Sequence, residues 1–464
     1  MSSGKQGVGF QSDLPKQPAS TRSRVDPAAR TPARPRAERE KLTGIQLATA
    51  FDGKLERGGT SVGYQIGILL VAGLMILLPL VYVAIIAGAG WLTARWAVVG
   101  GQMFHHVRGR GALLLGVVYL APLVAGGLLV LSMVLQMFWR SQKEPKPLWV
   151  DRREQPLLYA YVERLCAVMG APKPTRIDVI ATSNASAHID NGIFGLLSRR
   201  MVLTIGLPLA ATMDLKQFTG VLAHEVGHFS QGIFMRLSYA VQLINGWFAR
   251  MAWGRSGIDD LLDGMMADEP HWSFLLIALF SKLVLFVARL VMMLMAVISQ
   301  ALCMNLSRQA EFDADRRAAR IVGSDALAGG LQILPAVGAA GAMAVDRAEA
   351  GWTKRELPDD LILLTSGIQQ QLPQSLKDKL DASILSADTS WFDTHPPLFK
   401  RIAALRKARF AGVMTINAPA TELFKEFDEL SKLATIDFYD SIVGKALKPE
   451  YLVTTVLPRF GAAT

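Results

Sequence analysis

The sequence predicts a mostly helical α+β domain with a small sheet, carried on a scaffold of transmembrane helices with four spans. Half of the 464 residues are hydrophobic (51%) and only 19% are charged, which is a larger apolar surplus than a soluble domain of this length requires. Long segments without charge hold much of that surplus. Between them lies a stretch with the mixed helical and β patterns of a water-soluble domain.

The first segment, residues 1–44, is rich in Ser, Pro, Ala and Arg and contains few large apolar residues. It cannot bury enough surface to offset the entropy of ordering, so we expect a disordered N-terminal tail. A transit peptide is the alternative, and the prolines together with Asp13 and Asp26 count against it. The two cysteines, Cys166 and Cys303, lie far apart, which argues against a disulfide framework.

Two uncharged segments follow the tail, Ile66 to Gly90 and Gly111 to Trp139, with 25 and 29 residues. At about 1.5 Å per residue, each helix is longer than the ~30 Å hydrocarbon core of a bilayer. The region 62–140 is therefore predicted to form a transmembrane helical hairpin.

A second apolar zone, residues 231–305, is predicted to form a membrane-associated helical pair. Its second half is long enough to span, but it carries Lys282 and Arg289, and its first half is shorter and interrupted by polar residues. Either half can instead be an interfacial amphipathic helix, so two crossings or none remain open. The loop between the halves is acidic, and basic residues flank the first hairpin. The positive-inside rule then places the loop outside and the soluble domain in the cytoplasm.

The soluble domain is predicted in two parts, residues 147–230 and 306–410, with 411–464 as a C-terminal extension. The first part contains an amphipathic helix over Gln155 to Met169. Two β-rich runs, Arg176 to Thr182 and Arg199 to Gly206, follow it. A helix begins at Leu215 with Asp214 as its N-cap. In the second part, Ala326 to Val345 is uncharged but rich in Ala and Gly, and we interpret it as soluble helix.

The stretch HEVGH lies on the helix that begins at Leu215. His224 and His228 are four residues apart, so both imidazoles lie on one helical face and can bind one zinc ion at ~2.0–2.1 Å. Glu225 lies on the adjoining face, where it can take a proton from metal-bound water without acting as a ligand. Gly227 removes a side chain and permits close approach of another element. A chance match to this pattern is expected only about 0.01 times in a chain of this composition. We therefore predict one zinc ion per chain.

A catalytic zinc site needs a third protein ligand and an open position for water. Glu311, in SRQAEFDAD, is the best candidate. Asp315 lies one helical turn later and can orient a ligand imidazole. Taken alone, this stretch also fits a solvated charged face with Arg308, Arg316 and Arg317.

The order and spacing of HEVGH, SRQAEFDAD and THPPLFKRI (394–402) resemble those of the membrane-embedded gluzincins. These zincin-like metallopeptidases include the bacterial stress protease HtpX and the eukaryotic type I CAAX prenyl protease. The resemblance covers roughly residues 60–405. It implies that Glu311 is the third zinc ligand and that Asp315 is the aspartate of the family's ExxxD pattern. It also implies that His395 and Arg401 are catalytic residues that contact the substrate carbonyl or the tetrahedral intermediate.

The family also has an edge strand, Asn-Ala-Phe-Ala, that pairs with the peptide substrate. The four matching substrate-binding residues here are Asn184, Ala185, Ser186 and Ala187. Ser186 stands where the family has an aromatic residue, so the details of strand contact are left open.

These observations predict a zinc-dependent membrane endopeptidase that hydrolyses peptide bonds with metal-activated water. The expected partners are peptide or protein substrates, including membrane proteins, and the lipid bilayer. The resemblance implies a bacterial inner membrane and a role in membrane-protein quality control. The alternatives are a dedicated processing peptidase of lipidated or secreted precursors, and a non-catalytic zinc-bearing scaffold. Glu225 counts against the scaffold, because a structural zinc site has no use for a base. The net charge of +10 occurs without a nucleic-acid-binding motif, so we expect no nucleic acid.

Overall fold

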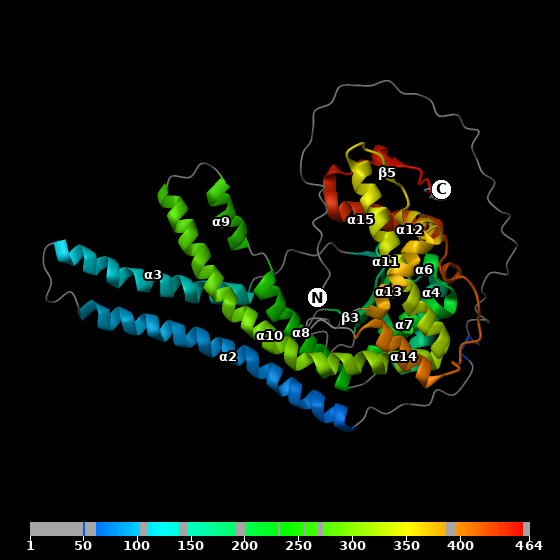
Figure 1. Ribbon diagram of the computed structural model, residues 1–464, viewed down its shortest axis with the longest axis horizontal. Helices are drawn as coiled ribbons and strands as arrows, with labels where there is room; N and C mark the ends of the chain where they lie inside the picture. The colour runs from blue at the N-terminus through cyan, green and yellow to red at the C-terminus, as the bar shows by residue number, and fades with distance from the viewer. Residues whose placement is uncertain are drawn as a thin grey trace, which may run out of the picture.

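The computed structural model describes residues 50–51, 62–102, 110–138, 147–190, 200–230, 233–254, 257–267, 272–386 and 396–457. These residues form an elongated molecule, in which a helical arm extends from a rounded domain (Figure 1). The predicted N-terminal tail lies outside the described residues.

The arm consists of four helices that pack side by side. They are α2 (Val62–Gly101), α3 (Arg110–Phe138), α8 (Ile233–Trp253) and the first part of α10 (Trp272–Val322). Helices α2 and α3 pack against each other, and the Tyr82 hydroxyl on α2 donates to the Met133 carbonyl on α3 at 3.1 Å. Buried residues of all four helices form one apolar core, including Met75, Tyr82, Met133, Phe248 and Met292.

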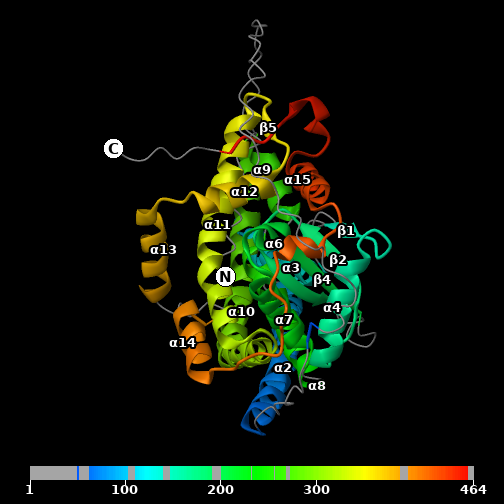
Figure 2. The same ribbon diagram turned by 90° about the vertical axis from the view of Figure 1, so that its right-hand side faces the viewer.

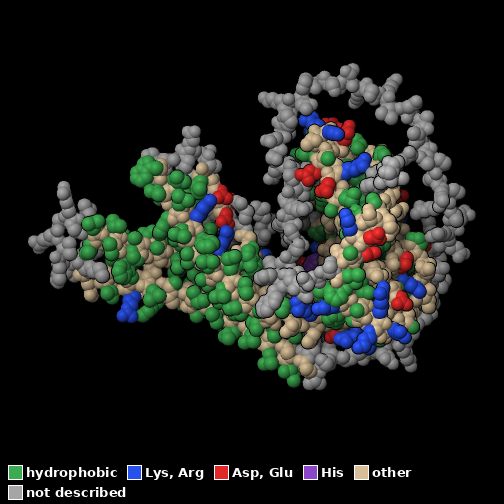
Figure 3. All heavy atoms as spheres, in the orientation of Figure 1, with side chains coloured by type: hydrophobic (Ala, Val, Ile, Leu, Met, Phe, Trp, Pro, Cys, Tyr) green, Lys and Arg blue, Asp and Glu red, His purple; other side chains and the backbone are tan. Residues whose placement is uncertain are grey.

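The outward surface of the arm is also apolar. Leu70, Leu114 and Leu283 are 64%, 73% and 58% exposed. Hydrophobic side chains cover most of the arm in Figure 3, whereas charged side chains gather on the domain. An exposed apolar surface of this extent is suited to lipid rather than to water, so the protein is an integral membrane protein.

A further helix, α9 (Gly257–Ala267), lies along the first part of α10. Its acidic side chains pair with the two bases of the apolar run. Lys282 Nζ lies 2.7 Å from an oxygen of Asp263, and Arg289 Nη2 lies 2.6 Å from an oxygen of Asp259. The bases that made this run doubtful as a span are therefore neutralised by the segment that precedes it.

The domain contains a four-stranded sheet with the order β1-β2-β4-β3. The strands are β1 (Leu148–Val150), β2 (Pro174–Ile180), β3 (Ala185–Ile189) and β4 (Met201–Gly206). β2 and β4 are parallel and correspond to the two predicted β-rich runs, while β3 pairs antiparallel with β4 and forms one edge. At Gly206, a Cβ atom would lie 2.3 Å from the carbonyl oxygens of Thr182 and Asn184. Only glycine therefore allows the end of β4 to approach the segment before β3 this closely.

Helices surround the sheet and enclose the main core. They are α4 (Pro156–Met169), α6 (Leu207–Thr212), α7 (Leu215–Phe229), α11 (Ser324–Trp352), α12 (Leu361–Gln370), α13 (Gln374–Ser386), α14 (Leu398–Ala408) and α15 (Phe427–Val443). Asp214 caps α7 as predicted, in a capping box with Gln217. Gly227 of α7 faces Ala314 of α10, where a Cβ atom would lie 3.4 Å from the Ala314 Cα. The predicted close approach at Gly227 is thus made by α10.

Four described helices are long and apolar enough to cross a membrane: α2, α3, α10 and α11. The number agrees with the prediction, but α8 is absent from this set and α11 is present. Helix α11 nevertheless packs against α7, α12 and α14 of the domain. The Ser183 hydroxyl also donates to its Val337 carbonyl at 3.3 Å. Many of its residues are Ala and Gly, whose small size lets neighbouring helices approach closely, as expected for a helix inside the domain.

The C-terminal extension, described to residue 457, packs back onto the same domain. It contains η2 (Ala420–Leu423), α15, η3 (Gly444–Ala446), η4 (Pro449–Tyr451) and β6 (Leu452–Val453). Strand β6 pairs in parallel with β5 (Leu357–Pro358). Asp360 caps α12 and accepts a hydrogen bond from the Ser431 hydroxyl of α15 at 2.6 Å. Figure 2 shows α12, α15 and β5 together at one end of the domain.

Candidate metal centre and active site

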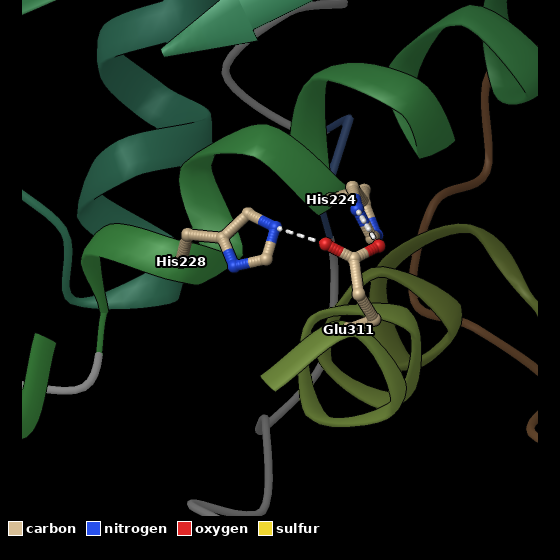
Figure 4. A group of neighbouring side chains, drawn as sticks. All are labelled: His224, His228 and Glu311. Atoms are coloured by element: carbon tan, nitrogen blue, oxygen red, sulfur yellow. Dashed lines mark ion pairs between the residues drawn. The ribbon is translucent and has the colours of Figure 1, made fainter. Parts of the chain in front are cut away.

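Three predicted ligands converge where α7 crosses the last part of α10. His224 and His228 project from α7, and Glu311 projects from α10 between them (Figure 4). His224 Nε2 lies 3.4 Å from Glu311 Oε2, and His228 Nε2 lies 3.5 Å from Glu311 Oε1. One ligand atom of each residue lies within 4.8 Å of the others.

These residues fit a metal ion in chemistry and in spacing. Two ligand atoms that are each ~2.1 Å from a tetrahedral zinc ion lie about 3.4 Å apart. The two nitrogen–oxygen separations agree with that value and are longer than ordinary hydrogen bonds. Two imidazole nitrogens and one carboxylate are also the donor set of catalytic zinc sites that keep a fourth position open.

Asp315 lies behind the first ligand, one helical turn after Glu311. Its Oδ1 is 2.9 Å from His224 Nδ1, so the Nε2 atom of the same ring is directed toward Glu311. A carboxylate on the distal nitrogen fixes the tautomer and the orientation of a ligand imidazole. Asp315 is only 2% exposed, which strengthens this interaction.

Arg401 of α14 also binds Asp315, next to the His224 ring. Its Nε and Nη2 atoms donate to Asp315 Oδ2 and Oδ1 at 2.8 and 2.7 Å, and its Nη1 lies 3.6 Å from Glu311 Oε2. This is the bidentate geometry that a guanidinium forms with a carboxylate. The predicted contact between Arg401 and the substrate stays a prediction. His395 lies outside the described residues, and its catalytic role also stays a prediction.

The described groups around Arg401 carry a surplus of negative charge. With neutral histidines, the three carboxylates of Glu225, Glu311 and Asp315 outnumber its one guanidinium. Burial lowers the pKa of His224, but Asp315 and Glu311 outweigh burial and raise that pKa to about 9. Burial raises the pKa of Asp315, but hydrogen bonds from Arg401 and His224 outweigh it and leave this pKa below its usual value. The site therefore favours a cation.

Glu225 lies next to the predicted substrate strand and outside the cluster of three ligands. The Ala187 N–H of β3 donates to Glu225 Oε2 at 3.3 Å. Asn184 is exposed and Ala185 to Ala187 are half-buried. The sequence predicted both groups but not this contact, because residues 38 apart meet only through the packing of β3 on α7. His188 also lies in β3, whereas His105, His106 and His271 lie outside the described residues.

Comparison with known proteins agrees with this geometry. The chain is 29% identical to Protease HtpX of Pseudomonas savastanoi pv. phaseolicola over 262 residues, which cover 55% of this chain and 72% of that protein. It is 27% identical to Protease HtpX of Pseudomonas syringae pv. tomato with the same coverage. It is 28% identical to Protease HtpX of Hahella chejuensis over 42% of this chain and 53% of that protein. No solved structure matches the chain. The model of peptidase family M48 matches residues 152–409, more than half of the chain. The protein therefore belongs to peptidase family M48, and it is a metal-dependent membrane protease.

Proposed function

We propose that this protein is a zinc-dependent membrane endopeptidase that acts in membrane-protein quality control. The observation that carries the proposal is the convergence of His224, His228 and Glu311, with Glu225 beside them and outside the ligand set. A site built only for stability would use a fourth protein ligand and would not place a base next to a sheet edge.

The residues of the chain divide the chemistry among them. When bound, zinc supplies a Lewis acid that polarises the scissile carbonyl and lowers the pKa of a bound water toward ~7. Glu225, positioned by the Ala187 N–H, removes the proton of the attacking water and later delivers it to the leaving amine. Asp315 and Arg401 keep the His224 ring in place while charge develops at the substrate.

The edge strand β3 supports broad substrate selection. A peptide that adds to a sheet edge is held by main-chain hydrogen bonds, which every sequence can form. Such binding requires an extended, unfolded segment and little side-chain identity. This property suits the removal of damaged membrane proteins better than the processing of a single precursor.

We further propose that α2, α3, α8 and α10 span the membrane. His224 and Glu311 meet at 3.4 Å, so the chain between them crosses an even number of times. If α10 crosses, α8 must cross as well. Asp315 and Arg401 also meet, and among the described helices between them only α11 is long and apolar enough to cross, so α11 does not cross. The basic flanks place the domain in the cytoplasm, and the bacterial relatives favour the inner membrane.

This topology predicts which side of the membrane each segment reports. A cysteine introduced at Asp263 of α9 should react with an impermeant reagent added from outside, whereas one at Lys425 should react only after the membrane is opened. The Cys166→Ser/Cys303→Ser background removes both native thiols, which are buried. If Asp263 and Lys425 report the same side, α8 and α10 lie on the membrane and do not cross it.

The proposed activity is tested with an unstructured protein substrate and detergent-solubilised enzyme. The wild type should degrade the substrate and carry about one zinc per chain. Glu225→Gln should keep the zinc and lose activity, and His228→Ala should lose both. Glu429→Gln, on an exposed turn of α15, is a matched control that should behave as the wild type.

Each alternative function has its own outcome in the same experiment. Zinc-loaded wild type that cleaves nothing would support the non-catalytic scaffold. A single defined product would favour the dedicated processing peptidase. An inactive His228→Ala with full zinc occupancy would contradict the metal site itself.

A further inference from the structure

The outer edge of β3 presents backbone groups at alternate residues. The Asp190 N–H donates to the Arg200 carbonyl at 2.9 Å, toward β4, whereas the Ala187 N–H donates to Glu225, away from β4. In an antiparallel pair the N–H and C=O of one residue point to the same side, and the side alternates along the strand. Ala185, Ala187 and Ile189 therefore direct their backbone groups to the outer edge.

Two of these outer groups are already occupied, the Ala187 N–H by Glu225 and the Ile189 carbonyl by Tyr239. The Tyr239 hydroxyl donates to the Ile189 carbonyl at 3.3 Å. Tyr239 is half-buried, and its ring packs against the main core of the domain. It belongs to α8, which is part of the arm, so a side chain of the arm reaches the edge of the sheet in the domain. Ile189 lies two residues, or about 7 Å, along the strand from Ala187.

We infer that Tyr239 is a specificity-determining residue that ends the segment of β3 on which a peptide can pair. The inference rests on the proposed peptidase function and deepens it. A substrate can pair with the outward groups of Ala185 and with the Ala187 carbonyl, but at Ile189 the Tyr239 hydroxyl occupies the outer side of the carbonyl, where a substrate amide would donate. The closed end is the one where the arm joins the domain, because α8 follows α7 directly in the chain.

The substitution Tyr239→Phe isolates the hydroxyl, since it retains the ring and its packing. Released from Tyr239, the Ile189 carbonyl can accept from one further substrate amide. We expect KM for a long unstructured peptide to fall about two- to tenfold, the value of one hydrogen bond, with kcat unchanged. Peptides shortened at the end that reaches Ile189 should show no difference between the two enzymes.

A scan of ester substitutions through the peptide identifies the amide concerned, because an ester lacks the N–H donor. We expect one position at which the ester weakens binding two- to tenfold in Tyr239→Phe and has no effect in the wild type. Binding is also measured by fluorescence anisotropy with Glu225→Gln and Glu225→Gln/Tyr239→Phe, which differ only in the hydroxyl and do not require turnover. The same shift in affinity should appear there.

Tyr439→Phe is the matched control, because the Tyr439 hydroxyl also donates to a backbone carbonyl, that of Pro358 at 3.1 Å, away from β3. It should leave KM and the ester profile unchanged. The inference is overturned if Tyr239→Phe gains no ester-sensitive position, or if it changes short and long peptides equally, as a purely structural role would. If peptides bind with the expected shift but the wild type cleaves none, the proposed function fails while the role of Tyr239 stands.

Discussion

Helix α10 carries two groups of charged side chains, which differ in how fully their charges are paired. In the arm, Lys282 and Arg289 each meet one aspartate of α9, so the formal charges cancel. In the domain, Glu311 and Asp315 share the guanidinium of Arg401, and the formal charge of these three groups is −1. The comparison teaches that charged side chains near lipid are neutralised by partners of opposite charge, whereas those at the predicted active site keep a net negative charge that can bind a cation.

The two groups are also separated by a meaningful distance. Arg289 and Glu311 are 22 residues apart on one continuous helix, which corresponds to about 33 Å. This is close to the ~30 Å thickness of the hydrocarbon core. The same helix therefore carries ion pairs within its apolar run and the predicted metal ligand Glu311 beyond the end of that run.

The largest effect is expected when Asp315 loses the guanidinium of Arg401. Arg401→Ala leaves Asp315 buried without a guanidinium, and Asp315 then holds the His224 ring less firmly. We expect kcat to fall on the order of 10²-fold, measured on the unstructured substrate, with zinc content normal. Arg406→Ala, exposed on the same helix, is the control. An unchanged rate in folded, zinc-loaded Arg401→Ala would show that the domain group needs no internal cation.

A smaller effect, on stability, is expected in the arm, and a second substitution should recover most of the loss. Arg289→Met removes the ion pair with Asp259 and should lower stability by about 2 kcal/mol, less than in a fully buried pair. Adding Asp259→Leu should recover most of the loss, because an apolar pair replaces an ionic one. Thermal unfolding in detergent micelles measures both. Asp315 and Arg401 replaced together should regain no activity.

The neighbouring pair of the arm provides an internal control. Asp259 and Arg289 are 17% and 23% exposed, whereas Asp263 and Lys282 are 45% and 37% exposed. Lys282→Met should therefore cost less than about 1 kcal/mol. Equal losses for the two bases would mean that burial does not govern the strength of these pairs.

The last effect concerns protons at the predicted metal site. In metal-free protein the pKa of His224 is about 9, so at neutral pH a proton occupies the position that a metal ion takes. Zinc must displace it, and zinc affinity should rise about tenfold from pH 7 to pH 8. Calorimetry in buffers of different ionisation enthalpy should detect the released proton. Asp315→Asn removes one cause of the raised pKa, so its affinity should depend less on pH; an unchanged slope would contradict this account.

Much of the site follows from local geometry and could be predicted from the sequence. Residues four apart on a helix share a face, which places His224 with His228 and Glu311 with Asp315. The cap at Asp214 and the spans of α2 and α3 follow equally from short-range rules, because capping and hydropathy depend on neighbouring residues.

What the tertiary structure decided are the contacts between distant segments. Arg401 meets Asp315 across 86 residues, and Tyr239 meets Ile189 across 50. Hydropathy likewise does not distinguish α11, which packs inside the domain, from a helix that faces lipid. Composition records how apolar a segment is but not what surrounds it, and hydrogen bonds between segments form only after packing has fixed their relative positions. The sequence alone therefore predicted the ligands, and the packing of α7, α8, α10 and α14 determined which distant side chains surround them.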